Sequence, residues 1–569
     1  MNKSIPMPSR HALACGIAAA LAFPSLAAAQ SSPPDAGSLL QQLEQPRVVP
    51  LPPRAAPLLP VPPPLLSISG PTVTLSGIRF AGNSLLGSAE LTPVVAGFLN
   101  RPLSFAELRG AATAVASAYR QAGWIVRVYL PQQDLADSVV TIQIVEARLG
   151  KVRQQGEALR IDAERLRRIV ETAQATGAPV GADALDRALL LANDLPGVAV
   201  AGRLAEGENQ AETDLVLEVV DQPMLSGEVS VENTGARSTG AARIATGLAV
   251  NSPLGIGDQA DALLMHARGT DYVRLAYALP VGSAGWRAGV HASHMSYKVV
   301  TPEFGLLDAK GTSTAVGALA SYPLIRSRLK NLYVSVGLDG RRFDNSSVGV
   351  TTTRYETRAA SVALYGNLFD DLGGGGTNSA KIGFVHGRVD LDGSPNQAAD
   401  AATTRTAGTF DVLRISAARQ QRLTDTFSLY AGLAGQLASK NLDSSEKFYL
   451  GGIGGVRAYP VSEAGGSEGA IVNLELRARL PASFNASGFY DWGTVRVNKH
   501  RESAGAAALN RYSLQGAGVS VGWVASFGLT IKATLARRIG SNPNATFSGN
   551  DQDGSLKMNR FWLQASLPF

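Results

Sequence analysis

The residues of this 569-residue chain that could do chemistry do not form a catalytic set. His291 and His294 are three residues apart, so on a strand they would face opposite sides and could not bind one metal ion. The run Gly373–Gly376 lacks the lysine of a phosphate-binding loop, which favours a turn between strands. There is no H-E-x-x-H motif and only one cysteine, Cys15. We therefore expect no enzymatic activity, no catalytic residue, no metal ion and no cofactor.

The composition indicates a folded chain with many turns. Apolar residues make up 45 % and charged residues 17 %, whereas a disordered chain needs low apolar content and high charge. The 60 glycines are roughly 11 % of the 569 residues, above the roughly 7 % that is average for proteins. The net charge is +6 and is spread along the chain, so we do not expect nucleic acid as a partner.

Residues 1–29 are predicted to be an export signal that is removed. Lys3 and Arg10 give a positive start, an apolar run follows from Ala12 to Phe23, and three alanines occupy positions 27–29. A membrane anchor is the alternative, but the run is short for the roughly 20 residues of a spanning helix. No later stretch is long and apolar enough for such a helix, so only a β-barrel could embed the exported chain in a membrane.

A short helix and a proline-rich segment come next. Within residues 30–47, Leu39, Leu40 and Leu43 would share one face of a helix that begins near Asp35. Residues 48–71 are dense in proline, which favours an extended spacer without a packed core. A proline-rich ligand for a partner domain is the alternative for this segment.

The order β-α-α-β-β occurs twice between residues 72 and 221. In the first copy, residues 72–147, the alternation predicts strands at 73–80, 125–130 and 139–145 and helices at 88–99 and 105–122. In the second copy, residues 148–221, it predicts strands at 149–153, 198–204 and 215–220 and helices at 163–173 and 182–193. An internal repeat of this kind indicates two small modules whose open strand edges could accept an extended polypeptide.

Residues 222–569 show the period-two alternation of membrane-spanning strands. Leu332, Val334, Val336 and Leu338 would face one way, and Phe561, Leu563, Ala565, Leu567 and Phe569 would share a face of the last strand. A soluble β-sandwich also alternates, but it rarely needs 569 − 221 = 348 residues in one run of strands. At roughly 10 residues per strand plus turns and loops, this length predicts a transmembrane β-barrel of about 16 antiparallel strands.

Four motifs in this region are informative as an ordered set. Leu450–Pro460 reads LGGIGGVRAYP, Phe489–Gly493 reads FYDWG, and the stretches ENTGARSTG and NSPLGIGD lie at 232–240 and 251–258. Together with the two modules, the proline-rich segment and the terminal Phe569, this set resembles the transporter component of two-partner secretion. That family (TpsB) belongs to the Omp85 superfamily of outer-membrane barrels that carry POTRA modules.

The resemblance implies a division of the chain. The expected parts are a plug helix in residues 30–47, a linker at 48–71, POTRA modules at 72–147 and 148–221, and a barrel at 222–569.

The resemblance also implies a loop near 450–468 that folds back into the barrel. Its tip would be Val456, Arg457, Ala458 and Tyr459. The family pairs the tip arginine with the aspartate of an F-x-D-x-G motif on the inner wall, here Asp491 with Phe489 and Gly493.

Two properties of this tip remain open at the level of sequence. The family has a glycine where this chain has Ala458, and alanine resists positive φ, so the tip either uses ordinary backbone or is strained. We expect the lumen to be filled with water. An ion pair of Arg457 would then determine the position of the loop more than it would contribute to stability. A merely solvated Arg457 is the alternative.

The terminal Phe569 is expected to have one or both of two roles. In outer-membrane barrels a terminal aromatic residue on an alternating strand resembles the signal read by the barrel assembly machinery. Simple packing in the aromatic belt is the other interpretation.

The function implied is export of a large partner protein of adhesin or haemolysin type (TpsA) across the bacterial outer membrane. The modules would bind the partner's secretion domain in the periplasm, and the chain, expected to be a monomer embedded in outer-membrane lipid, would export the unfolded partner. A barrel assembly factor of the same superfamily and a passive porin are the alternatives.

Overall fold

The computed structural model describes residues 34–44, 72–133, 138–156, 160–209, 211–501 and 509–569. The export signal predicted over 1–29 and the spacer predicted over 48–71 lie outside these residues. Within them, no helix has the length and apolar character needed to cross a membrane.

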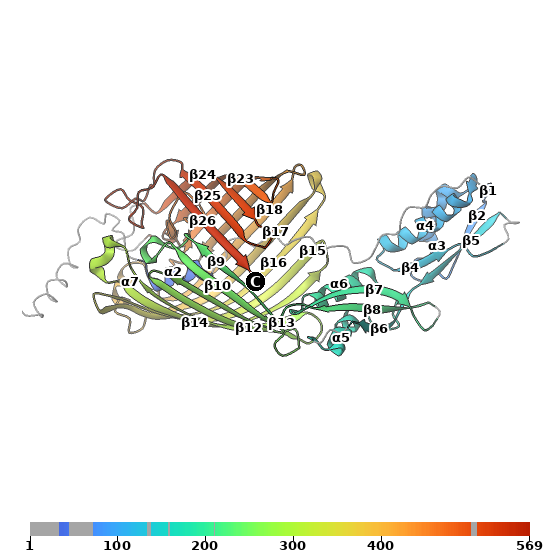
Figure 1. Ribbon diagram of the computed structural model, residues 1–569, viewed down its shortest axis with the longest axis horizontal. Coiled ribbons are helices and arrows are strands. Elements are labelled where there is room, and N and C mark those ends of the chain that lie inside the picture. The colour runs from blue at the N-terminus through green and yellow to red at the C-terminus, as the bar shows by residue number, and fades with distance from the viewer. Residues whose placement is uncertain (1–33, 45–71, 134–137, 157–159, 210, 502–508) are drawn as a thin grey trace, which may run out of the picture.

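A closed barrel of 16 antiparallel strands forms most of the chain and confirms the predicted fold class (Figure 1). Its strands in chain order are β9 (Leu225–Glu232), β10 (Arg243–Asn251), β11 (Gln259–Ala267), β12 (Thr270–Val281), β13 (Trp286–Lys298), β14 (Lys310–Arg326), β15 (Lys330–Ser347), β16 (Val350–Asp370), β17 (Gly376–Asp390), β18 (Gly408–Arg422), β19 (Phe427–Ala438), β22 (Glu468–Arg479), β23 (Phe484–Arg496), β24 (Arg511–Val524), β25 (Thr530–Arg538) and β26 (Asn559–Pro568). Short helices interrupt some connections: η2 (Arg237–Thr239), η3 (Pro302–Leu307), η4 (Leu372–Gly374) and α7 (Gln397–Ala402).

The alternation of side chains explains why these strands form a barrel with an apolar outside. On β16, Val362 and Leu364 face outward and are exposed, whereas Tyr355 and Thr357 face inward and are buried. On β26, Phe561 and Phe569 are more than half exposed, whereas Trp562 points inward and is only 5 % exposed. In the middle of the wall, these strands therefore place apolar groups on the membrane side and larger polar or aromatic groups in the lumen.

The barrel closes between its first and last strands over a short ladder. Strands β26 and β9 pair over five residues, from Gln564↔Glu232 to Pro568↔Glu228. The side chain of Asn233 extends this ladder, because its Nδ2 donates to the carbonyl of Phe561 (3.1 Å) and its Oδ1 accepts from the amide of Leu563 (2.7 Å). At the other end, Phe569 and Gly227 exchange two backbone hydrogen bonds.

Two small α+β units precede the barrel. The first contains β1 (Thr72–Thr74), β2 (Gly77–Ala81), α3 (Ser88–Val95), η1 (Ala96–Phe98), β3 (Pro102–Ser104), α4 (Phe105–Gln121), β4 (Val126–Tyr129) and β5 (Val139–Glu146). The second contains β6 (Arg148–Gln155), α5 (Ala163–Ala173), α6 (Ala182–Asn193), β7 (Val198–Glu206) and β8 (Glu212–Asp221). In both, the first long strand runs parallel to the last strand, which pairs antiparallel with the strand before it, in the orders β2-β5-β4 and β6-β8-β7.

The strand expected over 73–80 is wrong in one respect, because it is two strands. The chain breaks at Leu75, whose side chain is fully buried and whose carbonyl accepts from the amide of Asn100 (2.9 Å). Strand β1 therefore pairs with the additional strand β3 rather than continuing into the main sheet.

The second unit is docked against one end of the barrel. Asp194 and Asp186 accept bidentate hydrogen bonds from Arg326 and Arg328, which lie at the end of β14 and in the turn after it (2.7–2.9 Å). Arg165 of α5 donates to the carbonyl of Pro280 near the turn between β12 and β13 (3.0 Å). We call this the module end of the barrel and the opposite end the far end.

Candidate functional site: a loop and a helix inside the barrel

The barrel lumen holds the connection between β19 and β22, residues 439–467, which we call the lumen loop. It contains a two-stranded sheet of β20 (Phe448–Tyr449) and β21 (Gly465–Gly466). The amide of Gly452 donates to the carbonyl of Tyr459 (3.1 Å), and the amide of Tyr459 donates to that of Val456 (3.1 Å). These bonds make a tight tip of Val456, Arg457, Ala458 and Tyr459, all at most 5 % exposed.

Arg457 is held by two carboxylates of the barrel wall. Its Nε and Nη2 donate to the two carboxylate oxygens of Asp491 (2.9 and 2.6 Å), and its backbone amide donates to Asp491 as well (3.0 Å). Its remaining terminal nitrogen, Nη1, donates to Glu475 Oε1 (2.6 Å). The guanidinium also lies 3.5 Å from the ring centre of Phe489, a cation–π contact. The structure thus brings together the four predicted residues Arg457, Asp491, Phe489 and Gly493 in one place.

The charges around the tip balance. Glu475 also accepts from Arg477 (2.7 Å), so two carboxylates and two guanidiniums alternate in the order Asp491, Arg457, Glu475, Arg477. Asn473 adds a donor to Asp491 (2.7 Å). Because each buried charge has an opposite charge beside it, the cluster avoids the large cost of an isolated buried ion.

Small residues on the wall make room for the tip. A side chain at Gly516 would begin 2.5 Å from the Cβ of Ala458, and one at Gly493 would begin 3.1 Å from Val456. The Nε1 of Trp562, on the last strand, donates to the carbonyl of Arg457 (2.9 Å). Ala458 itself uses ordinary backbone, because the non-glycine residues of this loop with positive φ are Ser462 and Ala464.

Our expectation of a wet environment around Arg457 is wrong. Arg457 is 5 % exposed and Asp491 is fully buried, so the tip is packed rather than solvated. An ion pair in such a place stabilises the loop only with its full set of partners, and removing one partner of a buried pair costs about 3–5 kcal/mol.

The loop is held a second time at its base. Glu446, almost fully buried, accepts from Arg341 of β15 (2.9 Å) and from Arg414 of β18 (2.6 Å). Tyr355 of β16 donates to Asp443 (2.9 Å). The lumen loop therefore bridges nearly the full width of the barrel, from β15 at its base to β23 at its tip.

Helix α2 (Ala36–Glu44) lies in the lumen beside this loop. Its buried face carries Leu39 and Leu40, which pack in an apolar cluster with aromatic residues of the wall, and Leu43 packs at the edge of that cluster. Tyr272 and Ser293 donate to Glu44 at its C-terminal end (2.9 and 2.7 Å).

The helix also contacts the lumen loop directly. Ser444 donates to Asp35 (2.8 Å), Gln41 donates to the carbonyl of Lys447, and Gln42 donates to Ser462 (2.5 Å). The leucines are buried on the side of β13–β15, so α2 is wedged between the wall and both arms of the loop.

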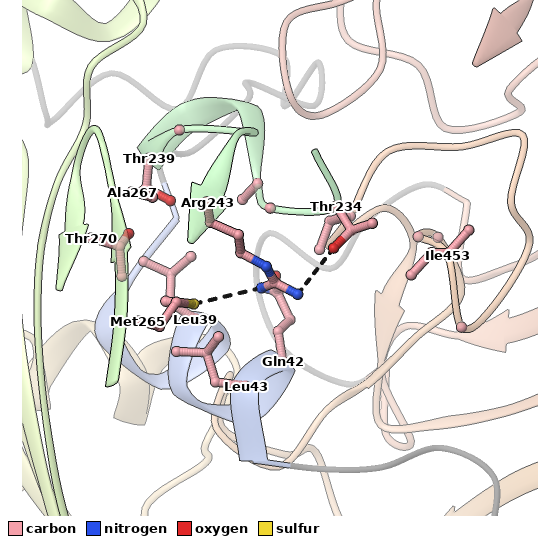
Figure 2. A pocket seen from close by; sticks show the side chains of 17 residues that line it. Leu39, Gln42, Leu43, Thr234, Thr239, Arg243, Met265, Ala267, Thr270 and Ile453 are labelled. Atoms are coloured by element: carbon pink, nitrogen blue, oxygen red, sulfur yellow. Dashed lines mark hydrogen bonds between the residues drawn. The ribbon is translucent and has the colours of Figure 1, made fainter. Parts of the chain in front are cut away.

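A cavity of about 390 Å³ borders the C-terminal half of α2. The loop between β9 and β10, residues 233–242, is the first far-end loop. Figure 2 shows Leu39, Gln42 and Leu43 facing Arg243 and this loop across the cavity. Arg243 is held by Glu232 of β9 and by Thr234 of the loop that follows β9 rather than by the helix. The helix is therefore buried on all sides from Ala36 to Gln41, and its last turn is packed less tightly.

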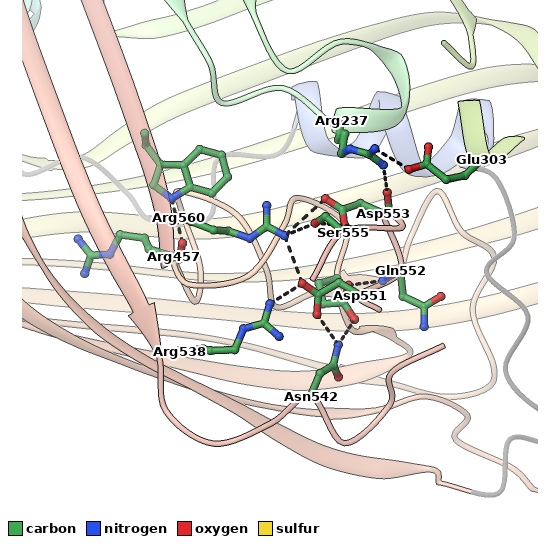
Figure 3. Close-up of polar contacts among 12 residues, drawn as sticks. Arg237, Glu303, Arg457, Arg538, Asn542, Asp551, Gln552, Asp553, Ser555 and Arg560 are labelled. Atoms are coloured by element: carbon green, nitrogen blue, oxygen red, sulfur yellow. Dashed lines mark hydrogen bonds and ion pairs between the residues drawn. The ribbon is translucent and has the colours of Figure 1, made fainter. Parts of the chain in front are cut away.

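The last far-end loop, residues 539–558, covers the tip on the side of the far end. Its Asp551 accepts from Arg560 (3.2 Å) and also from Arg538, whose guanidinium lies 4.6 Å from the ring centre of Tyr459. Figure 3 shows that Arg237 of the first far-end loop joins this cluster by donating to the carbonyl of Asp553 (2.8 Å).

Glu463 connects the lumen loop to this last loop. The side chain is fully buried and accepts from Asn542 and from the amide of Gln552 (2.8 Å each). Burial raises the pKa of Glu463 to about 7, and the nearby carboxylates of Asp551 and Asp553 act in the same direction.

The other predicted residues lie as follows. Phe569 closes the seam at the module end and presents its ring to the membrane side. Gly373–Gly376 lies at the turn between β16 and β17. Among the residues in the described ranges, no group of three or more His, Cys, Asp or Glu is placed to hold a metal ion.

Several residues of the site were not anticipated. Glu475, Trp562, Glu446 and Glu463 each contact the lumen loop or belong to it. Glu475 had a usable signal, since an acidic residue at an inward position between Leu474 and Leu476 needs a partner. Glu446 and Glu463 had none, because their partners are distant in the sequence.

Comparisons with known proteins agree with this architecture. A family model described as haemolysin secretion/activation protein ShlB/FhaC/HecB matches residues 211–524, and one described as POTRA domain, ShlB-type, matches residues 73–147. The heme/hemopexin transporter protein HuxB of Haemophilus influenzae (strain 86-028NP) is 26 % identical over 463 residues, which cover 80 % of this chain and 81 % of HuxB. CdiB from Escherichia coli, a solved structure, has a TM-score of 0.67 at 20 % identity and covers 91 % of this chain and 94 % of its own. BamA from Haemophilus ducreyi, lacking POTRA domains 1–3, has a TM-score of 0.53 at 15 % identity over 87 % and 100 %.

The fold and these matches define an outer-membrane β-barrel transporter with N-terminal modules in the periplasm. The chain belongs to the ShlB/FhaC/HecB family of two-partner secretion transporters, within the Omp85 superfamily, because the family model matches more than half of it. Members of this family are transporters rather than enzymes. The module end of the barrel is therefore periplasmic and the far end extracellular.

Glu463 predicts that the contact between the lumen loop and the last extracellular loop depends on pH. Its raised pKa means that the folded site disfavours the ionised form, so the contact is most stable below about pH 4.5, weakens as pH rises toward 7, and is weakest above pH 7. Amide hydrogen exchange over residues 540–556, corrected for its intrinsic pH dependence, should show roughly tenfold or more greater protection at pH 5 than at pH 8. The variant Glu463→Gln should remove the difference, and a pH dependence that survives in this variant would contradict the assignment.

Proposed function

We propose that the chain recognises the secretion domain of a large secreted partner protein in the periplasm and exports that partner, unfolded, through its barrel. The observation that carries this proposal is the content of the lumen. A 16-stranded barrel is filled by a helix from the N-terminal segment and by a loop, and both are held by side-chain contacts that can be broken. A chain could pass once the helix has left, while the partner's folding at the cell surface would supply the driving force.

Capture by the periplasmic modules is supported by their sheets. In the order β2-β5-β4, strands β2 and β4 each pair with one neighbouring strand of the sheet, and β6 and β7 do so in the order β6-β8-β7. An extended segment can add to such an edge through backbone hydrogen bonds. We retain the division into a plug helix segment at 30–47, modules at 72–147 and 148–221, and a barrel from 222 as part of this proposal.

Displacement of α2 is supported by the space beside it. The helix is buried from Ala36 to Gln41, but its C-terminal half borders the cavity beside Arg243, into which it can shift. Its polar contacts with the lumen loop involve three side chains, which water can replace once the helix moves.

The two alternatives fit these features less well. A passive porin has no need for periplasmic modules with open strand edges or for a filled lumen. An assembly factor of the same superfamily would act on many barrels, and its fold is shared by this chain, so the number of clients separates the two. The partner is a secreted protein, the chain is expected to act as a monomer, and Phe569 is proposed as the signal for the barrel assembly machinery.

Deletion of this protein tests the proposal at the level of the cell. A specific exporter predicts that one large secreted protein disappears from the medium while other outer-membrane barrels keep their normal abundance. Loss of many barrels would instead support the assembly factor, and an unchanged set of secreted proteins would overturn the export proposal.

The variant Arg457→Ala is expected to reduce export to below about a tenth while the barrel still inserts. The substitution leaves Asp491 buried and poorly paired, a cost of about 3–5 kcal/mol that falls on loop placement. Export is measured as partner protein in the medium, and insertion as the amount of barrel in outer membranes. Normal export by Arg457→Ala would contradict the role of the loop.

A disulfide between α2 and the lumen loop is expected to block export. A Cβ at Gly37 would lie 3.1 Å from the Cβ of Ser445, slightly closer than the roughly 3.5–4.5 Å of a disulfide, and 2.7 Å from the Oγ of Ser444, so the Ser444 side chain must rotate and the two backbones must separate slightly for the bond to form. The predicted mature chain has no cysteine of its own, so the pair Gly37→Cys and Ser445→Cys can be oxidised selectively. Export should stop when the pair is oxidised and return on reduction, whereas each single variant should export in both conditions. Undiminished export by the oxidised pair would show that α2 need not leave.

A further inference from the structure

A shallow groove of about 860 Å³ lies on the membrane-facing wall of the barrel, across β13–β18. Two rows of directly opposed residues form it. The row nearer the extracellular end is Val316, Gly340, Arg358, Arg388 and Thr409, and the row below it is Ala318, Leu338, Ala360 and His386. His386 pairs with Asp411 of β18, which lies opposite it (2.8 Å). The outward direction of both rows is set by the alternation of the strands, and Val316 and Leu338 are more than half exposed.

Two arginines lie opposite each other in the upper row. Arg358 of β16 and Arg388 of β17 are direct cross-strand partners, and like charges in this position destabilise a sheet. Arg358 has a 3.5 Å contact with Glu356, a carboxylate that is itself half exposed and within 4.0 Å of Arg342. Within the described residues, Arg388 makes no ion pair. This part of the described wall therefore offers an anion the unpaired guanidinium of Arg388 beside that of Arg358, although the next row above carries Asp390 opposite Glu356 and the next row below carries the ion pair of His386 with Asp411.

The level of these arginines on the barrel identifies the anion's source. On β16 the outward residues below Arg358 are Ala360, Val362 and Leu364, which belong to the apolar band. Arg358 and Arg388 are thus among the first charged groups on the extracellular side of that band, which is the level of lipid headgroups in the outer leaflet.

The groove also has room for an apolar chain beside the two charges. Gly340 lies between Val316 and Arg358, and a Cβ built on it would meet only Val316, at 4.0 Å. This leaves a hollow floored by Val316, Leu338 and Ala360 that leads down from the arginines into the apolar band.

We infer that this groove binds a phosphorylated lipid of the outer leaflet. Its phosphate would lie between Arg358 and Arg388, since a guanidinium fork matches phosphate oxygens, and an acyl chain would lie over Leu338 and Ala360. The site is separate from the lumen, so this inference does not depend on the proposed export function.

Native mass spectrometry of the full mature chain in detergent tests the site, with a bisphosphorylated lipid A as the probe. The double variant R358Q/R388Q should bind this lipid at least tenfold more weakly than the wild type. The double variant R511Q/R537Q is the matched control, because both arginines also face outward near the extracellular end, on β24 and β25, and it should stay within twofold of the wild type.

A second variant separates the groove from its charge. Gly340→Leu keeps both arginines but fills the hollow, and it should weaken lipid binding at least fivefold. Equal losses in R511Q/R537Q would reduce the site to general surface charge and overturn the inference. Equally tight binding of phosphatidylethanolamine would also overturn it, because that lipid needs no paired arginines. Displacement of the lipid by millimolar inorganic phosphate would overturn it as well, because it indicates a site for free anions.

Discussion

The buried ion pair between Arg457 and Asp491 is the interaction on which the interior of this barrel depends. A guanidinium at the tip of a long loop is far too costly to bury without carboxylates, and the wall supplies them at Asp491 and Glu475. Once the tip is fixed there, the surrounding wall must be small or complementary. Gly493 and Gly516 leave the necessary space, and Trp562 of the last strand binds the carbonyl of the same arginine.

The same interaction divides the contents of the lumen into a firmly held part and a loosely held part. The lumen loop is bound at both ends, by Asp491 at the tip and by Arg341 and Arg414 at the base. Helix α2 instead packs between that loop and the wall, with a cavity beside its C-terminal half. The second module is attached to the barrel by the ion pairs of Arg326 with Asp194 and Arg328 with Asp186, whose aspartates are about one third exposed, whereas Asp491 at the loop tip is fully buried. The loop tip is thus the most deeply buried of these attachments.

Much of this architecture can be predicted from local sequence. The rest cannot, because it depends on contacts between residues that are distant in the sequence. Alternation specifies the barrel strands, and amphipathic spacing places α5 at 163–173 and α6 at 182–193. The break at Leu75 escapes such patterns because it depends on burial against a distant helix. The tip residues follow only from a family resemblance, since no local pattern connects Arg457 to Asp491. The dryness of the pair, and the contacts of Glu446 and Glu463, depend on how loops fold in three dimensions, which period-two alternation does not encode.

A double-mutant cycle between Arg457 and Asp491 measures the central interaction most directly. The free energy of local opening at residues 456–459 is obtained by amide hydrogen exchange in the wild type, Arg457→Ala, Asp491→Ala and the double variant. A buried, mutually dependent pair predicts that the two single changes are strongly non-additive, with a coupling energy of about 2 kcal/mol or more. Additive effects, with a coupling energy near zero, would contradict the account that this pair holds the loop inside the barrel.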